Sequence, residues 1–371
     1  MTPIRIASKE IGRGCPCLMA AEIGINHNGD KDLAHQMLEA AAKAGADAVK
    51  FQNYRTEDFL SDRALTYEYV SQGRQVVESQ YDMFKRCELP TAWLRDLREH
   101  CDRLGVIFFS TPTSADGVEE LVRVGAPLLK NGSDYLVHLP LVRTMARSGL
   151  PTVLSTGMAT LAEVDNAVRA FREAGGLDLV LLHCTSSYPT PSADVHLLKI
   201  PTLAAAFGCP VGLSDHTDGI VAGVGAIALG ACMIEKHFTL DKTLPGPDHR
   251  FSADPNEFRT LVDAVRTMET SLGHGIIGPT PSEEKARRDY RLSCVAARSL
   301  PAGHRIEEKD VAFRRPGTGV PPAGIAWLIG LRLRKSLPCG KVLEPGDFLA
   351  EEISTLGDAP GASAPELVHE K

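Results

Sequence analysis

Short apolar runs alternate with longer amphipathic segments from about residue 18 to residue 272. The runs are nearly continuous in apolar character, which is what strands buried on both faces require. They are Leu18–Glu22, Ala48–Gln52, Val106–Thr111, Pro127–Lys130, Thr152–Ser155, Leu179–His183, Val211–Ser214 and Cys232–Glu235. Segments with helical periodicity lie between or after them, among them Lys31–Ala44, Ala92–Leu104, Ala115–Val124, Leu161–Ala174 and Pro255–Ser271. Eight such β-then-α units predict a (β/α)8 TIM barrel.

A doubly wound α/β sheet is the alternative fold. Such a sheet usually carries a glycine-rich phosphate loop directly after its first strand. Here the first predicted strand leads into Glu22-Ile23-Gly24-Ile25-Asn26-His27-Asn28-Gly29 instead. The pattern therefore favours the barrel.

The pattern changes after the predicted barrel domain, residues 1–275. Residues 276–285 are interrupted by Gly and Pro and predict a linker. Residues 286–353 combine short β-like runs with Pro-Gly turns, which predicts a small, mostly-β domain that is marginal alone and docks on something. Residues 354–371 are rich in Gly, Ala, Pro and Glu and predict a disordered tail.

The composition argues against several classes of partner. Lys plus Arg number 40 against 47 Asp plus Glu, a mild acidic excess that does not favour nucleic acid or a membrane surface. No apolar run approaches the roughly 20 residues of a membrane span. The nine cysteines are scattered without a metal or redox spacing, which predicts a reduced, cytoplasmic protein without disulfides.

Polar and ionisable residues collect where the predicted strands end. In a TIM barrel these ends face one pocket. The residues are Glu22, Lys50, Gln52, Thr111, Lys130, Ser133, Ser155, His183, Ser214, His216, Glu235 and His237. Two lysines among several hydroxyl groups suit a small phosphorylated or carboxylated substrate, although any one lysine could be a solvated surface charge.

Two histidines, His216 and His237, follow the last two predicted strands. On neighbouring strands they would lie close together and could share one divalent metal ion, with positions left open for water and substrate. Imidazole suits several first-row ions, so the residues alone do not choose the metal. Asp215 could orient one of the imidazole rings. The alternative is that each is a satisfied core histidine.

Three further residues could take part in chemistry. Glu22 could act as a general base or simply pair with a lysine. His183 fits a core histidine and a substrate ligand equally well. Asp248, in the loop after the last predicted strand, could reach a substrate hydroxyl or stabilise a turn.

Several segments, in matching order, resemble the sialic acid synthase family. They are Ala21–His27, Lys50–Gln52, Leu154–Met158, His183–Pro191, Gly212–Thr217, Glu235–Phe238 and Pro245–Asp248. The C-terminal domain resembles the antifreeze-like SAF (β-clip) domain of that family, with Arg314-Arg315-Pro316-Gly317-Thr318-Gly319 as its best-marked motif. The resemblance extends to about residue 353.

The resemblance implies a transferase that condenses phosphoenolpyruvate with an open-chain N-acylated mannosamine-type sugar and water. The products would be phosphate, released by C–O cleavage, and a 2-keto-3-deoxy acid, N-acetylneuraminate or legionaminate. The implied catalytic residues are Glu22, Lys50, Lys130 and His183. The implied substrate contacts are Gln52, Thr111, Ser133, Ser155, Ser186, Tyr188, Ser214, Asp248 and Arg315. His216 and His237 would hold the divalent metal, Mn²⁺ ahead of Mg²⁺ or Co²⁺.

The resemblance also implies a homodimer. In the family, the SAF domain of one subunit closes the barrel of the other. Arg315 would then reach the acylamino group of the sugar in the partner's site.

Some positions depart from the pattern of the family. Its Lys-Ile-Gly-Ser-Gly appears here as Lys130-Asn131-Gly132-Ser133-Asp134, Tyr135 replaces an acidic sugar contact, and Ser186 stands where some members have asparagine. The acceptor therefore stays open among N-acetylmannosamine, its 6-phosphate and the diacetamido-trideoxy hexoses. The Gly246–Ser252 loop favours the sialic and legionaminic branch over a pseudaminate synthase.

Three other functions remain as alternatives. One is a synthase that joins phosphoenolpyruvate to a sugar phosphate, one is a non-catalytic binding or assembly protein, and one is a metal-dependent hydrolase. The presence of Glu22, of Lys50 and Lys130, and of His216 and His237 argues against a non-catalytic protein. The small number of visible metal ligands argues against a hydrolase.

Overall fold

A closed barrel of eight parallel strands forms the first of two compact units in the computed structural model, which describes residues 3–350 and divides after Gly273. The strands are β3 (Leu18–Gly24), β4 (Ala48–Asn53), β7 (Ile107–Pro112), β8 (Leu129–Asn131), β9 (Thr152–Ser155), β10 (Leu179–Cys184), β11 (Val211–Asp215) and β12 (Met233–His237). Strand β12 pairs back with β3, which closes the ring. The predicted TIM barrel is confirmed.

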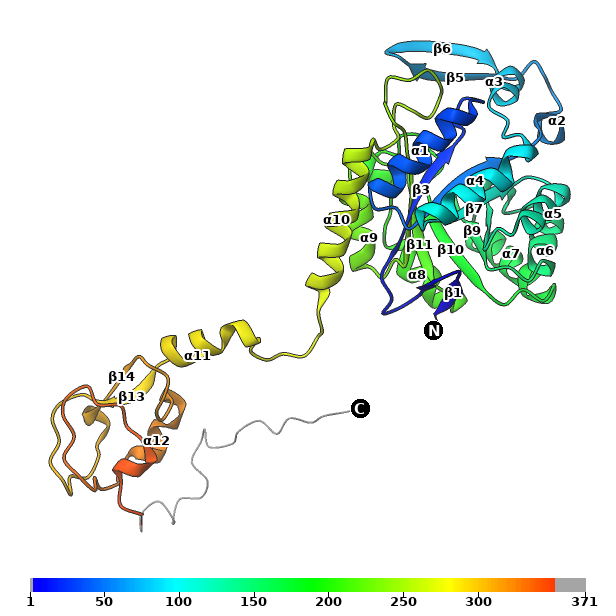
Figure 1. Ribbon diagram of the computed structural model, residues 1–371. Helices are drawn as coiled ribbons and strands as arrows, with labels where there is room; N and C mark the ends of the chain where they lie inside the picture. Colours follow the sequence, from blue (N-terminus) through cyan, green and yellow to red (C-terminus); the bar gives the residue numbers. More distant parts are fainter. Residues whose placement is uncertain (1–2, 351–371) are drawn as a thin grey trace. The chain divides into compact units, whose positions relative to one another are not determined.

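Helices surround the barrel (Figure 1). They are α1 (Lys31–Lys43), α4 (Thr91–Leu104), α5 (Ala115–Val124), α6 (Leu139–Arg147), α7 (Leu161–Glu173), α8 (Lys199–Phe207), α9 (Val221–Ala228) and α10 (Pro255–Leu272). Thr160 and Asp254 begin α7 and α10 with capping boxes, in which the side chain of the first residue and that of a following glutamate satisfy backbone N–H groups. All five helices expected from the sequence are present within a few residues.

An apolar layer fills the N-terminal half of the barrel interior. Its strand residues are Leu18, Ala20, Ala48, Ile107, Phe109, Val153, Val180, Leu182 and Met233, and Leu128 and Cys232 lie directly before β8 and β12. A hairpin of β1 (Ile4–Ile6) and β2 (Lys9–Ile11), which the sequence analysis did not anticipate, packs three isoleucines against this layer. Because side chains alternate along a strand, the residue two positions after the last layer residue of each strand also faces the barrel interior, nearer the C-terminal end of the strand.

A second hairpin lies at the other end of the barrel from β1 (Figure 1). The chain between β4 and α4 forms α2 (Thr56–Phe59), β5 (Thr66–Ser71), β6 (Arg74–Ser79) and α3 (Gln80–Arg86). The β5–β6 turn is Gln72-Gly73, with φ of 50° and 73°, as a tight hairpin turn requires. Its tip contacts the loop after β12, where the Ser71 hydroxyl accepts from the Gly246 N–H at 3.2 Å and the Gln72 amide donates to the Thr243 carbonyl at 3.1 Å.

The second unit has its own small core. It contains α11 (Glu284–Tyr290), an antiparallel pair of β13 (Ser293–Ala296) and β14 (Val311–Arg314), and α12 (Ile325–Leu328). The predicted linker, 276–285, forms a 3-10 turn over Pro281–Glu283 and runs into α11. The predicted tail, 354–371, lies outside the described residues. Between residues 3 and 350 no helix has both the length and the apolar character to cross a membrane.

Candidate active site

The C-terminal ends of the barrel strands enclose a cavity of about 650 Å³, within the range of small-molecule sites. Thirteen of the fifteen site residues expected from the sequence line it. They are Glu22, Lys50, Gln52, Thr111, Lys130, Ser133, Ser155, Ser186, Tyr188, Ser214, His216, His237 and Asp248. Strand alternation explains this convergence, because most of them continue the inward-facing series of the apolar layer below.

A buried ionic cluster forms the floor of the cavity. The Lys50 Nζ lies 2.9 Å from Glu22 Oε1 and donates to the Thr111 hydroxyl at 3.0 Å. The Gln52 amide donates to the same Glu22 oxygen at 2.9 Å. Lys50 and Glu22 are both almost fully buried. Burial alone would lower the pKa of Lys50, but the charges of Glu22 and Glu235 outweigh burial and raise it.

Glu235 is the site residue to which the sequence analysis gave no role. Its Oε1 accepts from the Ser214 hydroxyl at 2.9 Å and lies 3.8 Å from Lys130 Nζ, and its Oε2 lies 3.9 Å from Lys50 Nζ. Burial alone would raise its pKa, but the two lysines outweigh burial and lower it. The signal was available, because Glu235 stands two residues before His237 on the same strand and so faces the same way.

Lys130 differs from Lys50 in its surroundings. It is buried, donates to its neighbouring Asn131 carbonyl at 3.1 Å, and has Glu235 as its ion-pair partner. Burial lowers the pKa of Lys130, because Glu235 only partly offsets the loss of hydration. An incoming anion would therefore stabilise its charged form.

Hydroxyl groups lie in the wall near these lysines. The Ser133 hydroxyl accepts from the Gly157 N–H at 3.0 Å. Within residues 3–350, the buried hydroxyls of Ser155 and Ser186 make no hydrogen bond. Buried polar atoms left this way are costly. The two serines are consequently free to donate to the oxygens of a bound anion.

The two histidines meet above the ionic floor, with ring centroids 5.4 Å apart. Nδ1 of His216 donates to the Thr185 carbonyl at 2.9 Å, and its Nε2 lies 3.4 Å from the Ser214 hydroxyl. Nδ1 of His237 is buried and makes no hydrogen bond within the described chain. Burial, together with the charge of His216, holds the pKa of His237 well below its usual range. Burial alone would lower the pKa of His216, but its contacts with Cys184 and the Thr185 carbonyl and the charge of Glu235 outweigh burial and raise it. A divalent ion would bind deprotonated ring nitrogens, so its binding would displace a proton from His216.

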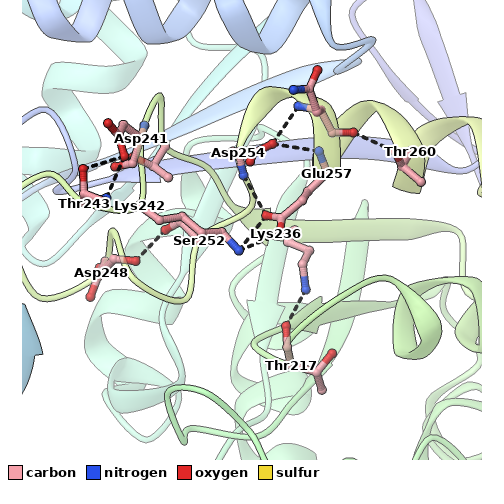
Figure 2. A network of polar contacts seen from close by, with 12 residues as sticks. Thr217, Lys236, Asp241, Lys242, Thr243, Asp248, Ser252, Asp254, Glu257 and Thr260 are labelled. Carbon is pink, nitrogen blue, oxygen red and sulfur yellow. Dashed lines mark hydrogen bonds and ion pairs between the residues drawn. The ribbon is translucent and has the colours of Figure 1, made fainter. Parts of the chain in front are cut away.

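Asp248 approaches this pair from the loop after β12. Its Oδ2 lies 3.7 Å from Nδ1 of His237. Burial, followed by the charge of Glu22, raises the pKa of Asp248 to about 7. The Ser252 hydroxyl donates to the Asp248 carbonyl at 2.6 Å and fixes the turn (Figure 2).

Asp215 does not orient an imidazole ring, in contrast to the expectation. Asp215 and Lys236 are adjacent across the β11–β12 pair and alternate with the inward-facing residues, so both point outward to the helix layer. The Lys236 Nζ donates to Asp215 Oδ2 at 2.9 Å. It also donates to the Thr217 carbonyl at 2.7 Å (Figure 2). The Asp215 carboxylate also accepts from the Thr217 N–H and hydroxyl. This buried network ties together the strand ends that carry the two histidines.

His183 is turned away from the cavity, and a catalytic role does not fit its position. It lies between Leu182 and Cys184, which face the interior, so alternation points it outward. Its Nε2 lies against the Val195 carbonyl, to which it donates. Cys184 lines the cavity in its place.

Arg315 belongs to the second unit, where its guanidinium carbon stacks 5.1 Å from the ring centroid of Tyr290. Its contact with a sugar stays a prediction. Of the departures from the family pattern, Asp134, Tyr135 and Ser186 line the cavity, whereas the Asn131 amide faces the Met145 sulfur at 3.9 Å.

Comparisons with known proteins show the family of this chain. The family model of the NeuB family matches residues 37–277, and that of the SAF domain matches residues 293–349. The N,N'-diacetyllegionaminic acid synthase of Legionella pneumophila is 40% identical over 90% of this chain and 95% of its own length. The pseudaminic acid synthase of Campylobacter jejuni is 36% identical over 88% and 95%. The crystal structure of the N-acetylneuraminic acid synthetase of Leptospira borgpetersenii superposes with a TM-score of 0.70 at 34% identity, covering 77% of this chain and 95% of that chain.

Proposed function

The chain belongs to the NeuB family, and on that premise we propose that it condenses phosphoenolpyruvate with an open-chain N-acylated mannosamine-type sugar and water. The enol carbon of phosphoenolpyruvate would bond to the aldehyde carbon of the sugar. Water would add at the neighbouring carbon, and phosphate would leave with cleavage of its C–O bond. The product would be a sialic-acid-like 2-keto-3-deoxy acid.

The observation that carries this proposal is the pair of buried lysines beside the two histidines. Lys50 and Lys130 would hold the phosphate and carboxylate of phosphoenolpyruvate and stabilise the charge of the leaving phosphate. Ser155 and Ser186 would donate to its oxygens from their unpartnered hydroxyls. Glu22, held by Lys50 and Gln52, would orient the sugar or the attacking water and accept its proton.

A divalent ion, Mn²⁺ in first place, would be held by His216 and His237 and would supply Lewis-acid polarisation of the sugar aldehyde. Calorimetric titration with Mn²⁺ tests this without reference to activity. His237→Ala should lose the tight site, whereas His274→Ala, at an exposed histidine after the barrel, should keep it. Equal binding by both variants would contradict the assignment.

Phosphate release from phosphoenolpyruvate, measured with Mn²⁺ and a panel of N-acylated sugars, tests the reaction itself. Release should depend on one class of sugar, and mass spectrometry should find the acid expected from the sum of sugar and pyruvate. Lys130→Met should abolish release, whereas Lys309→Met, at a surface lysine of the second unit that is 69% exposed, should not. No release with any sugar would overturn the proposal.

We further propose a cytoplasmic homodimer in which Arg315 reaches the site of the partner. All nine cysteines are free thiols, which is typical of a reducing compartment. Arg315→Ala should raise the KM for the sugar more than the KM for phosphoenolpyruvate, with Arg314→Ala as the matched control. An equal change in both KM values would contradict the contact.

A further inference from the structure

Two histidines outside the cavity face one another across neighbouring helices of the barrel. His35 lies on α1 and His100 lies on α4, and the two helices pack against each other. The Nδ1 atoms of the two rings are 2.7 Å apart, whereas the ring centroids are 4.9 Å apart. The two nitrogens therefore point at each other, and the rings do not stack on their faces.

A carboxylate lies at the other nitrogen of each ring. Nε2 of His35 lies 3.1 Å from Asp96 Oδ2, and Nε2 of His100 lies 3.7 Å from Glu39 Oε1. Asp96 Oδ2 also pairs with the Lys31 Nζ at 2.7 Å, which holds this carboxylate in place. Histidines that bind a metal ion through one nitrogen almost always donate the other ring N–H to a carboxylate, a carbonyl or water. Each ring of this pair has a carboxylate at its Nε2 for that purpose.

The hydrogen between the two Nδ1 atoms belongs to His100. The Asp96 carboxylate accepts a hydrogen from Nε2 of His35, so the neutral ring of His35 has its lone pair on Nδ1. The facing Nδ1 of His100 must then donate. Burial, followed by the charges of His35 and Arg103, lowers the pKa of His100, which favours its neutral form. A cation that took both Nδ1 lone pairs would move this hydrogen to Nε2 of His100, where the Glu39 carboxylate would accept it.

The pair is accessible enough to admit an ion. The side chains of His35 and His100 are 22% and 13% exposed. Two nitrogens that each lie about 2.0–2.1 Å from a tetrahedral zinc ion are about 3.3–3.4 Å apart, so the two nitrogens have to separate by roughly 0.6 Å. Rotation of partly exposed side chains supplies a shift of this size. Within residues 3–350 no three ligating side chains converge on one point, so water would complete the coordination.

We propose that His35 and His100 form a divalent-cation site that binds Zn²⁺ and links α1 to α4 on the outside of the barrel. The inference does not depend on the proposed function, because neither ring lines the cavity. Zn²⁺ stands above Mn²⁺ in the general order of affinities and suits imidazole, so the site should prefer Zn²⁺. The two residues are 65 apart along the chain and β4 lies between them, so a bound ion would stabilise this part of the barrel against unfolding.

Calorimetric titration with Zn²⁺ tests the site in a His216→Ala/His237→Ala chain, which lacks the histidines proposed to bind metal in the cavity. We expect one saturable site per chain, tighter for Zn²⁺ than for Mn²⁺. His100→Ala in this background should lose the site, whereas His274→Ala, at an exposed histidine after the barrel, should keep it. No saturable binding in the background chain, or equal binding after His100→Ala, would overturn the inference. If the background chain did not fold, the natural chain should still bind one more Zn²⁺ than its His100→Ala variant, and an equal number would decide against the site.

The carboxylates and the stability of the barrel give two further measurements. Glu39→Ala should weaken Zn²⁺ binding about 10–100-fold, the usual effect of removing the partner of a ligating histidine. Glu99→Ala, at an exposed carboxylate of α4, should leave the affinity unchanged. Zn²⁺ should raise the midpoint of thermal unfolding of the barrel in the background chain but not in its His100→Ala variant. An equal rise in both chains, or an equal loss of affinity in the two glutamate variants, would speak against the site.

Discussion

Replacing Lys236 by methionine should destabilise the barrel severely. Lys236 and Asp215 are 4% and 2% exposed, and the ammonium group donates to both the Asp215 carboxylate and the Thr217 carbonyl. Methionine fills a similar volume but leaves the carboxylate charged and buried, with only the N–H and hydroxyl of Thr217 as donors. Removing one partner of a buried pair costs about 3–5 kcal/mol.

Denaturant unfolding followed by tryptophan fluorescence measures this cost. The chain has two tryptophans, Trp93 in the barrel and Trp327 in the second unit. In a Trp327→Phe background, Trp93 alone reports on the barrel, so the unfolding of the second unit does not distort the signal. The free energy of unfolding comes from linear extrapolation to zero denaturant.

Two controls separate the burial of the charge from the loss of a side chain. Asp215→Asn combined with Lys236→Met removes both charges and should recover part of the loss, giving a coupling energy in a double-mutant cycle. Arg169→Ala breaks an exposed pair with Asp165 and should cost only about 0–1 kcal/mol. A loss below about 1 kcal/mol in Lys236→Met would refute the reasoning.

Three further changes test other parts of the structure with the same kind of measurement. Phe258→Ala empties a fully buried site on α10 and should lower the free energy of unfolding of the barrel by about 3–5 kcal/mol. Gly212→Ala places a Cβ 2.4 Å from the Met233 carbonyl oxygen on the adjacent strand, and the resulting backbone shift should cost about 1–3 kcal/mol. In the second unit, hydrogen bonds from His304 and Arg298 hold the pKa of buried Asp310 at about 2 against the effect of burial. The contribution of Asp310 to the free energy of unfolding is therefore fully present above about pH 4, the pKa of an aspartate in the unfolded chain, and is lost as the pH falls from about 4 to about 2. In a Trp93→Phe background, where Trp327 alone reports, Asp310→Asn should flatten the dependence of this free energy on pH over that range.

The sequence predicted the barrel because burial on both faces leaves a clear pattern. A strand that is covered by helices on its outer face and by side chains on its inner face is apolar at nearly every position. Eight such runs that alternate with helical segments are compatible with few folds. The convergence of strand ends in a barrel also predicted that Lys50 and Lys130 would face the same cavity, and both line it. The error at His183 came from considering only the end of each run, because His183 ends a run but faces outward. Glu235 was correctly placed in the pocket, but no role was assigned to it.

The position of the β5–β6 hairpin was not predictable in the same way. The β5–β6 hairpin had a local signal, Gln72-Gly73 between alternating residues. Its direction is set by contacts with Thr243 and Gly246, which are more than 170 residues away along the chain. No local pattern contains that information, so the sequence did not predict that this hairpin would lie against the loop after β12.

The buried charges of the cavity floor explain why the two lysines are not equivalent. Lys50 is held by Glu22 and Glu235, and its pKa is raised, so its charge is already compensated before substrate binds. Lys130 has Glu235 at 3.8 Å and a lowered pKa, so its charged form is only partly compensated. A bound anion therefore gains more at Lys130, because there it replaces hydration that burial has removed. The floor thus combines one lysine that serves as a counter-charge to two carboxylates with one whose charge is only partly compensated. Under the proposed function, the phosphate or carboxylate of the substrate would gain more on the β8 side of the barrel, where Lys130 lies.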